Sequence, residues 1–176
     1  MSSLVWYLII GGVAVNGVHA YLLFTQERRW SISEHGISGK KARAIYMAGH
    51  FIGVIFLFLF ARQFYLEQYN SKLVFSVALL GAAFEISQSI VPAKGKYNIP
   101  HVILAYGMWL SYMATGFLGV SKLPLPHQAK LLATSLLFVI ASLFVVAHSI
   151  NRNNVWKVQM AMIMLYPVSL GLMLVK

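Results

Sequence analysis

The side chains that could do chemistry in this sequence are few, and most of them interrupt long apolar runs. Glu85 is the one acidic residue within such a run, and four of the six histidines lie in runs as well. Charged and strongly polar groups are costly in hydrocarbon, so they tend to face the interior of a helical bundle. The candidate ligand-binding residues are therefore Asn16, His19, His50, Glu85, Gln88, His101, His148 and Gln159.

These residues all lie toward the same end of their runs. At ~1.5 Å per residue along a helix, each falls within roughly 12 Å of the boundary next to the first, third or fifth connecting segment. The opposite halves offer Arg62 at a helix end and scattered Ser and Thr. This asymmetry predicts a polar chamber that opens toward those three segments. Apolar walls with a few convergent polar groups are typical of a ligand site.

Glu85 is the main candidate for acid–base chemistry. Inside a bundle it is either a buried neutral acid or one half of a Glu–His pair, and both states suit proton transfer or metal ligation. His101 opens the following run, so Glu85 and His101 form the candidate catalytic pair. A purely structural hydrogen bond to a neighbouring helix is the alternative.

The histidines suggest a possible metal or haem site. His19, His50, His101 and His148 belong to four different runs. Two imidazoles from facing helices could ligate haem, and His19, His50, His101 and Glu85 are candidate ligands for a divalent metal ion. The spacing favours neither group, because there is no HExxH, no Glu-x-x-His and no pair of histidines on one helix. A single histidine in such a run is more often a hydrogen-bonded packing or interfacial residue than a ligand.

The composition places the chain in a membrane. Of its 176 residues, 59% are hydrophobic and 10% are charged, against about 25% charged in soluble domains. The net charge of +10 would suit a nucleic-acid binder, but the basic residues lie between apolar runs, so we expect no nucleic-acid partner. The absence of cysteine excludes disulfides, thiol catalysis, iron–sulfur clusters and cysteine zinc sites.

Six apolar runs are long enough to cross a bilayer as helices, since ~30 Å of hydrocarbon needs ~20 residues. They lack the alternation of barrel strands and are about twice too long for them. Short connectors predict antiparallel neighbours, so we expect an all-α fold: one domain, residues 1–176, with six transmembrane helices in one antiparallel bundle. The predicted helices cover residues 4–24, 44–61, 73–91, 101–120, 131–150 and 155–175.

The distribution of basic residues predicts the orientation. Of the 14 Lys and Arg residues, nine lie on the side of the first, third and fifth connectors and five on the other. The positive-inside rule then puts those three connectors in the cytoplasm, with both termini outside and the protein in the plasma (inner) membrane.

The first connector, residues 25–43, is the one long connector. Ser31 and Glu34 fit a capping box, so a short interfacial helix is expected there, with Gly36 at its end. The basic residues around it could bind lipid phosphates, although topology alone would also explain them. These candidate head-group contacts are Arg28, Arg29, Lys40, Lys41 and Arg43.

Small residues predict where helices approach closely. Gly49 and Gly53 form a GxxxG pair in the second run, and Gly11, Gly12 and Gly81 offer similar surfaces. Because such patterns have low specificity, packing is the favoured interpretation.

Two short segments carry a resemblance to a known family. They are residues 32–36 (ISEHG) after the first run, and Pro92 followed by His101 and residues 102–106 (VILAY). The arrangement resembles an uncharacterised prokaryotic six-helix domain-of-unknown-function family that is similar to the FRAG/DRAM-like group of membrane proteins. The resemblance implies a multi-pass fold and no settled activity. The association of related groups with membrane lipid handling favours a lipid ligand.

The chain departs from that family's pattern at two places. His35 stands where the family has Leu, and Ala93 and Lys94 stand where it has an acidic residue. The second departure removes the acid that would pair with His101, so Glu85 would have to supply it.

Four functions are compatible with the sequence. Binding or handling of a membrane lipid or amphipathic small molecule in the chamber requires only the observed asymmetry. The alternatives are an intramembrane metal-dependent enzyme using His and Glu, a bis-His haem electron carrier, and an accessory or assembly subunit with a membrane-protein partner.

Overall fold

The computed structural model describes residues 2–25, 32–36, 38–149 and 155–175, although the side chains of residues 32, 35 and 147–149 are not part of that description. The described chain is all-helical and contains six helical segments long and apolar enough to cross a membrane. The fold class expected from the sequence is therefore confirmed, and the six spans point to a membrane protein.

The helices follow the apolar runs but extend beyond several of them into polar residues. They are α1 (Ser3–Thr25), α2 (Ile32–Gly36), α3 (Lys40–Ala61), α4 (Lys72–Ile90), α5 (Asn98–Lys122), α6 (His127–Ser149) and α7 (Val155–Leu172).

The second apolar run marks only part of its helix. The helix starts four residues before the predicted boundary at residue 44, and after α3 it continues as a π-helix, η1 (Arg62–Gln68). Hydropathy locates the apolar part of a helix, whereas backbone hydrogen bonding continues through polar residues at its ends. The short helix expected in the first connector is present as α2, which ends at Gly36; Ser31 lies outside the described residues.

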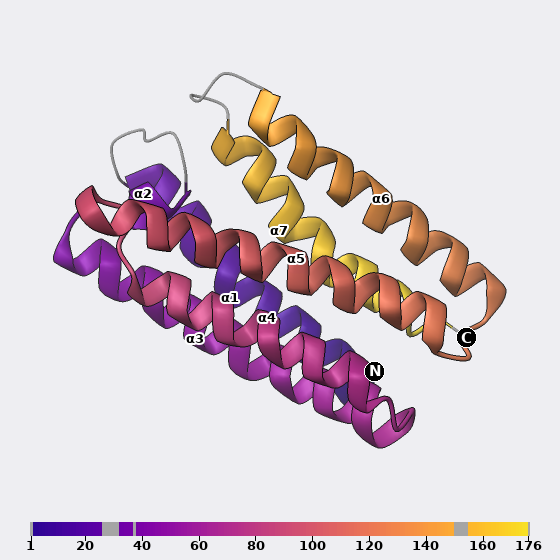
Figure 1. Cartoon of the computed structure of the whole chain (residues 1–176). Coiled ribbons are helices and arrows are strands. Elements are labelled where there is room, and N and C mark those ends of the chain that lie inside the picture. The colour runs from indigo at the N-terminus through magenta and orange to yellow at the C-terminus, as the bar shows by residue number, and fades with distance from the viewer. Residues whose placement is uncertain (1, 26–31, 37, 150–154, 176) are drawn as a thin grey trace.

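The six long helices form a closed ring. Each packs on its neighbours in the order α1, α3, α4, α5, α6, α7 and back to α1. Figure 1 shows the two termini at one end of the bundle and α2 at the other, where it contacts α1, α3 and α7. The first residues of α3, α5 and α7 therefore lie at the end that carries α2.

Small residues allow α1 and α3 to approach closely. A Cβ added to Gly49 would lie 2.6 Å from Cγ2 of Val18, and one added to Gly11 would lie 3.4 Å from the carbonyl oxygen of Gly53. Gly53 faces Val15 in the same way. The GxxxG pair thus serves helix packing, as the sequence predicts.

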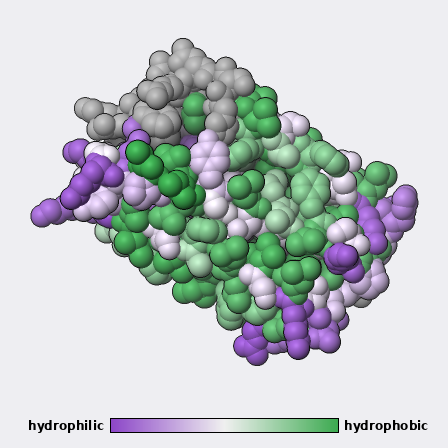
Figure 2. All heavy atoms as spheres, viewed as in Figure 1, coloured by the Kyte–Doolittle hydropathy of each residue, from purple (hydrophilic) through white to green (hydrophobic). Residues whose placement is uncertain are grey.

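The outer surface suits a lipid environment. Large apolar side chains are exposed on several helices, among them Trp6, Leu110 and Phe138. In Figure 2 hydrophobic residues cover the middle of the visible face, and hydrophilic residues gather toward its ends. A soluble protein rarely exposes so continuous an apolar surface, whereas a bilayer covers it.

The α1–α3 contact gives a first prediction. Gly53→Ala should destabilise the protein by about 1–3 kcal/mol, because Val15 is β-branched and cannot rotate away easily. Thermal unfolding in mild detergent measures the effect. Gly17→Ala is the matched control, since nothing lies within 4 Å of a Cβ added there. Equal melting temperatures for the two variants would contradict the packing role.

Candidate intramembrane binding site

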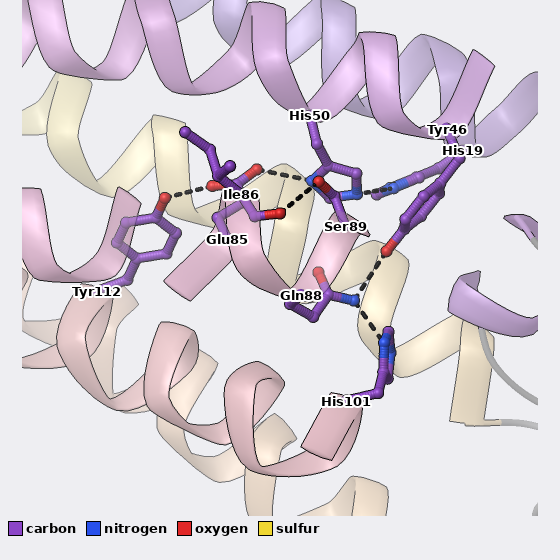
Figure 3. A network of polar contacts seen from close by, with 9 residues as sticks. All are labelled: His19, Tyr46, His50, Glu85, Ile86, Gln88, Ser89, His101 and Tyr112. Carbon is purple, nitrogen blue, oxygen red and sulfur yellow. Dashed lines mark hydrogen bonds and ion pairs between the residues drawn. The ribbon is translucent and has the colours of Figure 1, made fainter. Parts of the chain in front are cut away.

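Glu85 lies at the centre of a buried polar cluster. It is on α4 and only 6% of its surface is exposed. Its Oε1 lies 2.7 Å from Nδ1 of His50 on α3, and its Oε2 accepts a hydrogen bond from the hydroxyl of Tyr112 on α5 (Figure 3). Of the two states expected from the sequence, the geometry favours the Glu–His pair. Three helices are thereby joined around one carboxylate.

His19 extends this cluster to α1. Its Nε2 lies 3.1 Å from Nε2 of His50, so one of these nitrogens donates to the other. If His50 is neutral with its proton on Nδ1, the proton between the rings comes from His19; if His50 is an imidazolium, His50 donates to His19. In both cases Nδ1 of His19 is buried without a partner in the described chain.

A glycine creates the space for Tyr112. Gly81 precedes Glu85 by one turn of α4, and a Cβ added to it would lie 2.6 Å from the Tyr112 ring. The ring therefore packs against α4 at Gly81, with its hydroxyl at the Glu85 carboxylate. Tyr166 on α7 donates to the Tyr112 carbonyl at 3.1 Å, and the two rings stack with centroids 5.2 Å apart.

Tyr112 and Tyr166 were not among the site residues expected from the sequence. Tyrosine is common in apolar helices, so its presence there carries little information by itself. The usable signal is that a buried tyrosine hydroxyl needs a polar partner, and Glu85 is the acidic group available at that depth.

A second cluster lies one turn further along α4. The amide Nε2 of Gln88 donates to the Tyr46 hydroxyl at 2.8 Å and lies 3.1 Å from Nε2 of His101. Nδ1 of His101 lies 2.7 Å from the Val91 carbonyl. A carbonyl only accepts and this amide nitrogen only donates, so His101 is neutral with its proton on Nδ1. His101 thereby ties the start of α5 to the end of α4.

The candidate catalytic pair is divided between these clusters. Glu85 bonds to His50 and Tyr112, whereas His101 bonds to Gln88 and Val91. The Tyr46 ring links the clusters, since its centroid lies 4.4 Å from that of His50.

A cavity of about 90 Å³ adjoins Glu85 inside the ring of helices. Asn16 lines it, and Nδ2 of Asn16 donates to the Gly12 carbonyl, which leaves its Oδ1 buried and unpaired. The walls come from α1, α3, α4, α5 and α7: Tyr7, Leu8, Gly11, Gly12, Val15, Asn16, His50, Gly53, Leu57, Glu85, Met108, Trp109, Tyr112, Ile163, Tyr166, Pro167 and Leu170.

An apolar groove of about 430 Å³ runs beside the cavity, between α1 and α7. Its rim includes Val13, Met164 and Val168, each at least half exposed, so the groove opens onto the surface that faces lipid. Four residues line both spaces: Leu8, Gly12, Asn16 and Pro167.

The remaining candidate residues lie elsewhere. Gln159 is half-buried on α7 and is not among the residues that line the cavity. The side chain of His148, and Arg28 and Arg29, fall outside what the structure describes.

Three of the basic residues expected to contact lipid head groups lie in described parts of the chain. Two of them are exposed, and the third bonds to another helix. Lys40 and Lys41 are exposed in the first turn of α3. Arg43 donates to the Ile90 carbonyl, where it satisfies a backbone group at the end of α4.

The candidate metal ligands do not form a metal-binding group in the described part of the chain. No three His, Asp or Glu side chains there converge in a way that could hold an ion. His19, His50 and Glu85 instead bond directly to one another.

Comparisons with known proteins give one distant similarity. No family model matches the chain, and no solved structure matches it. A UPF0182 protein of Kocuria rhizophila is 28% identical over 135 residues, which is 77% of this chain but 13% of that protein. The similarity agrees with an uncharacterised family, and the chain spans only a small part of the relative's length.

Replacing the buried Glu85 should lower the stability of the protein more than replacing the exposed Glu67. Glu85→Leu should destabilise the protein by about 3 kcal/mol, because His50 and Tyr112 lose their acceptor in a buried site. The control is Glu67→Leu, which breaks an exposed ion pair with Arg62 and should cost less than about 1 kcal/mol. Thermal unfolding in detergent compares them.

A double mutant tests whether the loss arises at Glu85 itself. Tyr112→Phe should destabilise the unmodified protein but add little to Glu85→Leu, since the two substitutions remove the same hydrogen bond. Fully additive effects would show that the bond contributes nothing.

Proposed function

We propose that this protein binds an amphipathic small molecule or lipid within the membrane, with the polar head in the central cavity and the apolar chain in the α1–α7 groove. The observation that carries the proposal is the contact between the two spaces. Gly12, Asn16 and Pro167 line both, so a molecule lying in the apolar groove would have its polar end beside the Glu85 cluster.

The volumes of the two spaces support a polar head in the cavity and an apolar chain in the groove. A protein cavity of about 150 Å³ can bind benzene, so a cavity of about 90 Å³ suits a group with fewer atoms than benzene. A whole lipid does not fit there, whereas a small head group does. The groove is several times larger, and its exposed rim would let a chain enter sideways from the bilayer.

The unpaired Oδ1 of Asn16 is a further argument for a ligand. A buried polar atom without a partner is costly, and such atoms are commonly satisfied by a bound molecule or by water. The resemblance to the FRAG/DRAM-like group supports a lipid as the ligand, because related groups are associated with lipid handling.

Blocking the passage between the two spaces tests the proposal. Gly12→Leu should fill the passage and remove the bound amphiphile. A Cβ added there would lie 3.5 Å from Cγ of Pro167, which is ordinary van der Waals contact, so α1 can keep its place and the protein should stay folded. Mass spectrometry of lipid retained per protein after extensive washing in mild detergent measures the loss. Gly17→Leu, on the same helix but in open space, should retain the wild-type amount. Equal retention by both variants would refute the binding site.

We also propose that the end carrying α2 faces the cytoplasm, because nine of the 14 basic residues lie there. The chain has no cysteine, so single cysteines can report the orientation. In intact cells, an impermeant maleimide should label Ser121→Cys but label Tyr97→Cys only after permeabilisation. Both positions are exposed and neither change alters the charge count. The reverse pattern would overturn the assignment.

A further inference from the structure

Two acceptors at the cavity can take a further hydrogen bond, whereas the hydroxyl protons of Tyr112 and Tyr166 are already donated within the protein. Glu85 contributes a carboxylate and Asn16 contributes its unpaired Oδ1. Pro167 has no N–H, so the Ile163 carbonyl one turn earlier lacks the donor that a continuous helix would provide. No Lys or Arg is found among the described residues that line the cavity. The wall is therefore suited to a group that donates hydrogen bonds and carries positive charge.

Aromatic rings surround the same space. Tyr7, Trp109, Tyr112 and Tyr166 all line the cavity, and they come from α1, α5 and α7. The face of an aromatic ring attracts a cation, by about 0.5–1 kcal/mol at exposed sites and about 2 kcal/mol where water is excluded. Several rings beside one carboxylate are the usual surroundings of a bound ammonium group.

We propose that the head group bound in this cavity is a small organic ammonium, carried on an apolar chain that lies in the α1–α7 groove. The inference rests on the proposed binding function and specifies its ligand. The ammonium N–H groups donate to Asn16 Oδ1 and to the Glu85 carboxylate, and the rings face the cation. The carboxylate keeps its bonds to His50 and Tyr112, since each oxygen can accept more than one hydrogen bond.

The same wall disfavours other head groups. A phosphate, sulfate or carboxylate would meet the Glu85 carboxylate. The basic side chain at the cavity, His50, already bonds to that carboxylate, and no Lys or Arg among the described cavity residues adds a further positive charge. A hydroxyl could donate to Asn16 but would gain nothing from the aromatic rings. Head groups on an identical chain should therefore bind in the order ammonium, hydroxyl, anion.

The test uses three probes with the same chain: dodecylamine, which is protonated at neutral pH, dodecanol and dodecyl sulfate. Binding of each radiolabelled probe is measured to the full chain in nanodiscs of neutral lipid, with empty nanodiscs subtracted. Dodecylamine should bind at least about tenfold more tightly than dodecanol, the factor expected from cation–π and carboxylate contacts. Dodecyl sulfate should not bind above the empty nanodiscs.

Two tryptophan variants provide the matched control. Trp109→Leu removes a ring of the cavity wall, and Trp6→Leu removes an exposed ring on the lipid face. The preference for dodecylamine should fall several-fold in the first variant and be unchanged in the second. Glu85→Gln should lower the same preference; if it fails to fold, the tryptophan pair still decides the outcome.

The possible failures are distinguishable. If dodecanol binds as tightly as dodecylamine, or if Trp109→Leu leaves the preference unchanged, the ammonium assignment is wrong and the binding site stands. If dodecyl sulfate binds best, the assignment is likewise wrong. If none of the three probes binds above empty nanodiscs, the proposed function fails together with the assignment.

Discussion

The buried carboxylate of Glu85 constrains this structure more than any other single group does. Glu85 sits inside a ring of apolar helices, where an unpaired charge would cost several kcal/mol. A basic partner and a hydroxyl donor must therefore be held beside it. His50 and Tyr112 meet this need from the two helices that flank α4, so the position of the acid dictates how α3, α4 and α5 are rotated.

The demands of that site explain features that look unrelated in the sequence. Gly81 is small because the Tyr112 ring must lie against α4 to reach the acid, and Gly53 is small because α1 must lie against α3 to bring His19 to His50. The aromatic side chains that fill the centre do not pack completely. The remaining space is the cavity, which lies beside the acid because the polar cluster and the bulky rings converge there.

Much of this arrangement could be predicted from the sequence, and the rest depends on contacts between helices. Apolar length alone located six spans, because hydrocarbon thickness sets that length. Placing Glu85, His19 and His50 toward one end was possible because the rise per residue converts a position in an apolar run into a depth. Their inward direction followed from the cost of such groups in lipid. The π-helix η1 and the Arg43 contact with Ile90 were not foreseen, since both depend on backbone groups that hydropathy does not describe. Tyr112 was missed because its role exists only beside Gly81 and Glu85 of another helix.

The order of the polar residues along the chain has a consequence for biogenesis. Chains are made from the N-terminus, so α1 and α3 leave the ribosome before α4. His19 and His50 are thus already available when Glu85 emerges, and Tyr112 follows on the next helix. The acid enters the bilayer with its basic partner made in advance, and a nascent chain of the first four helices already contains a complete His–Glu pair.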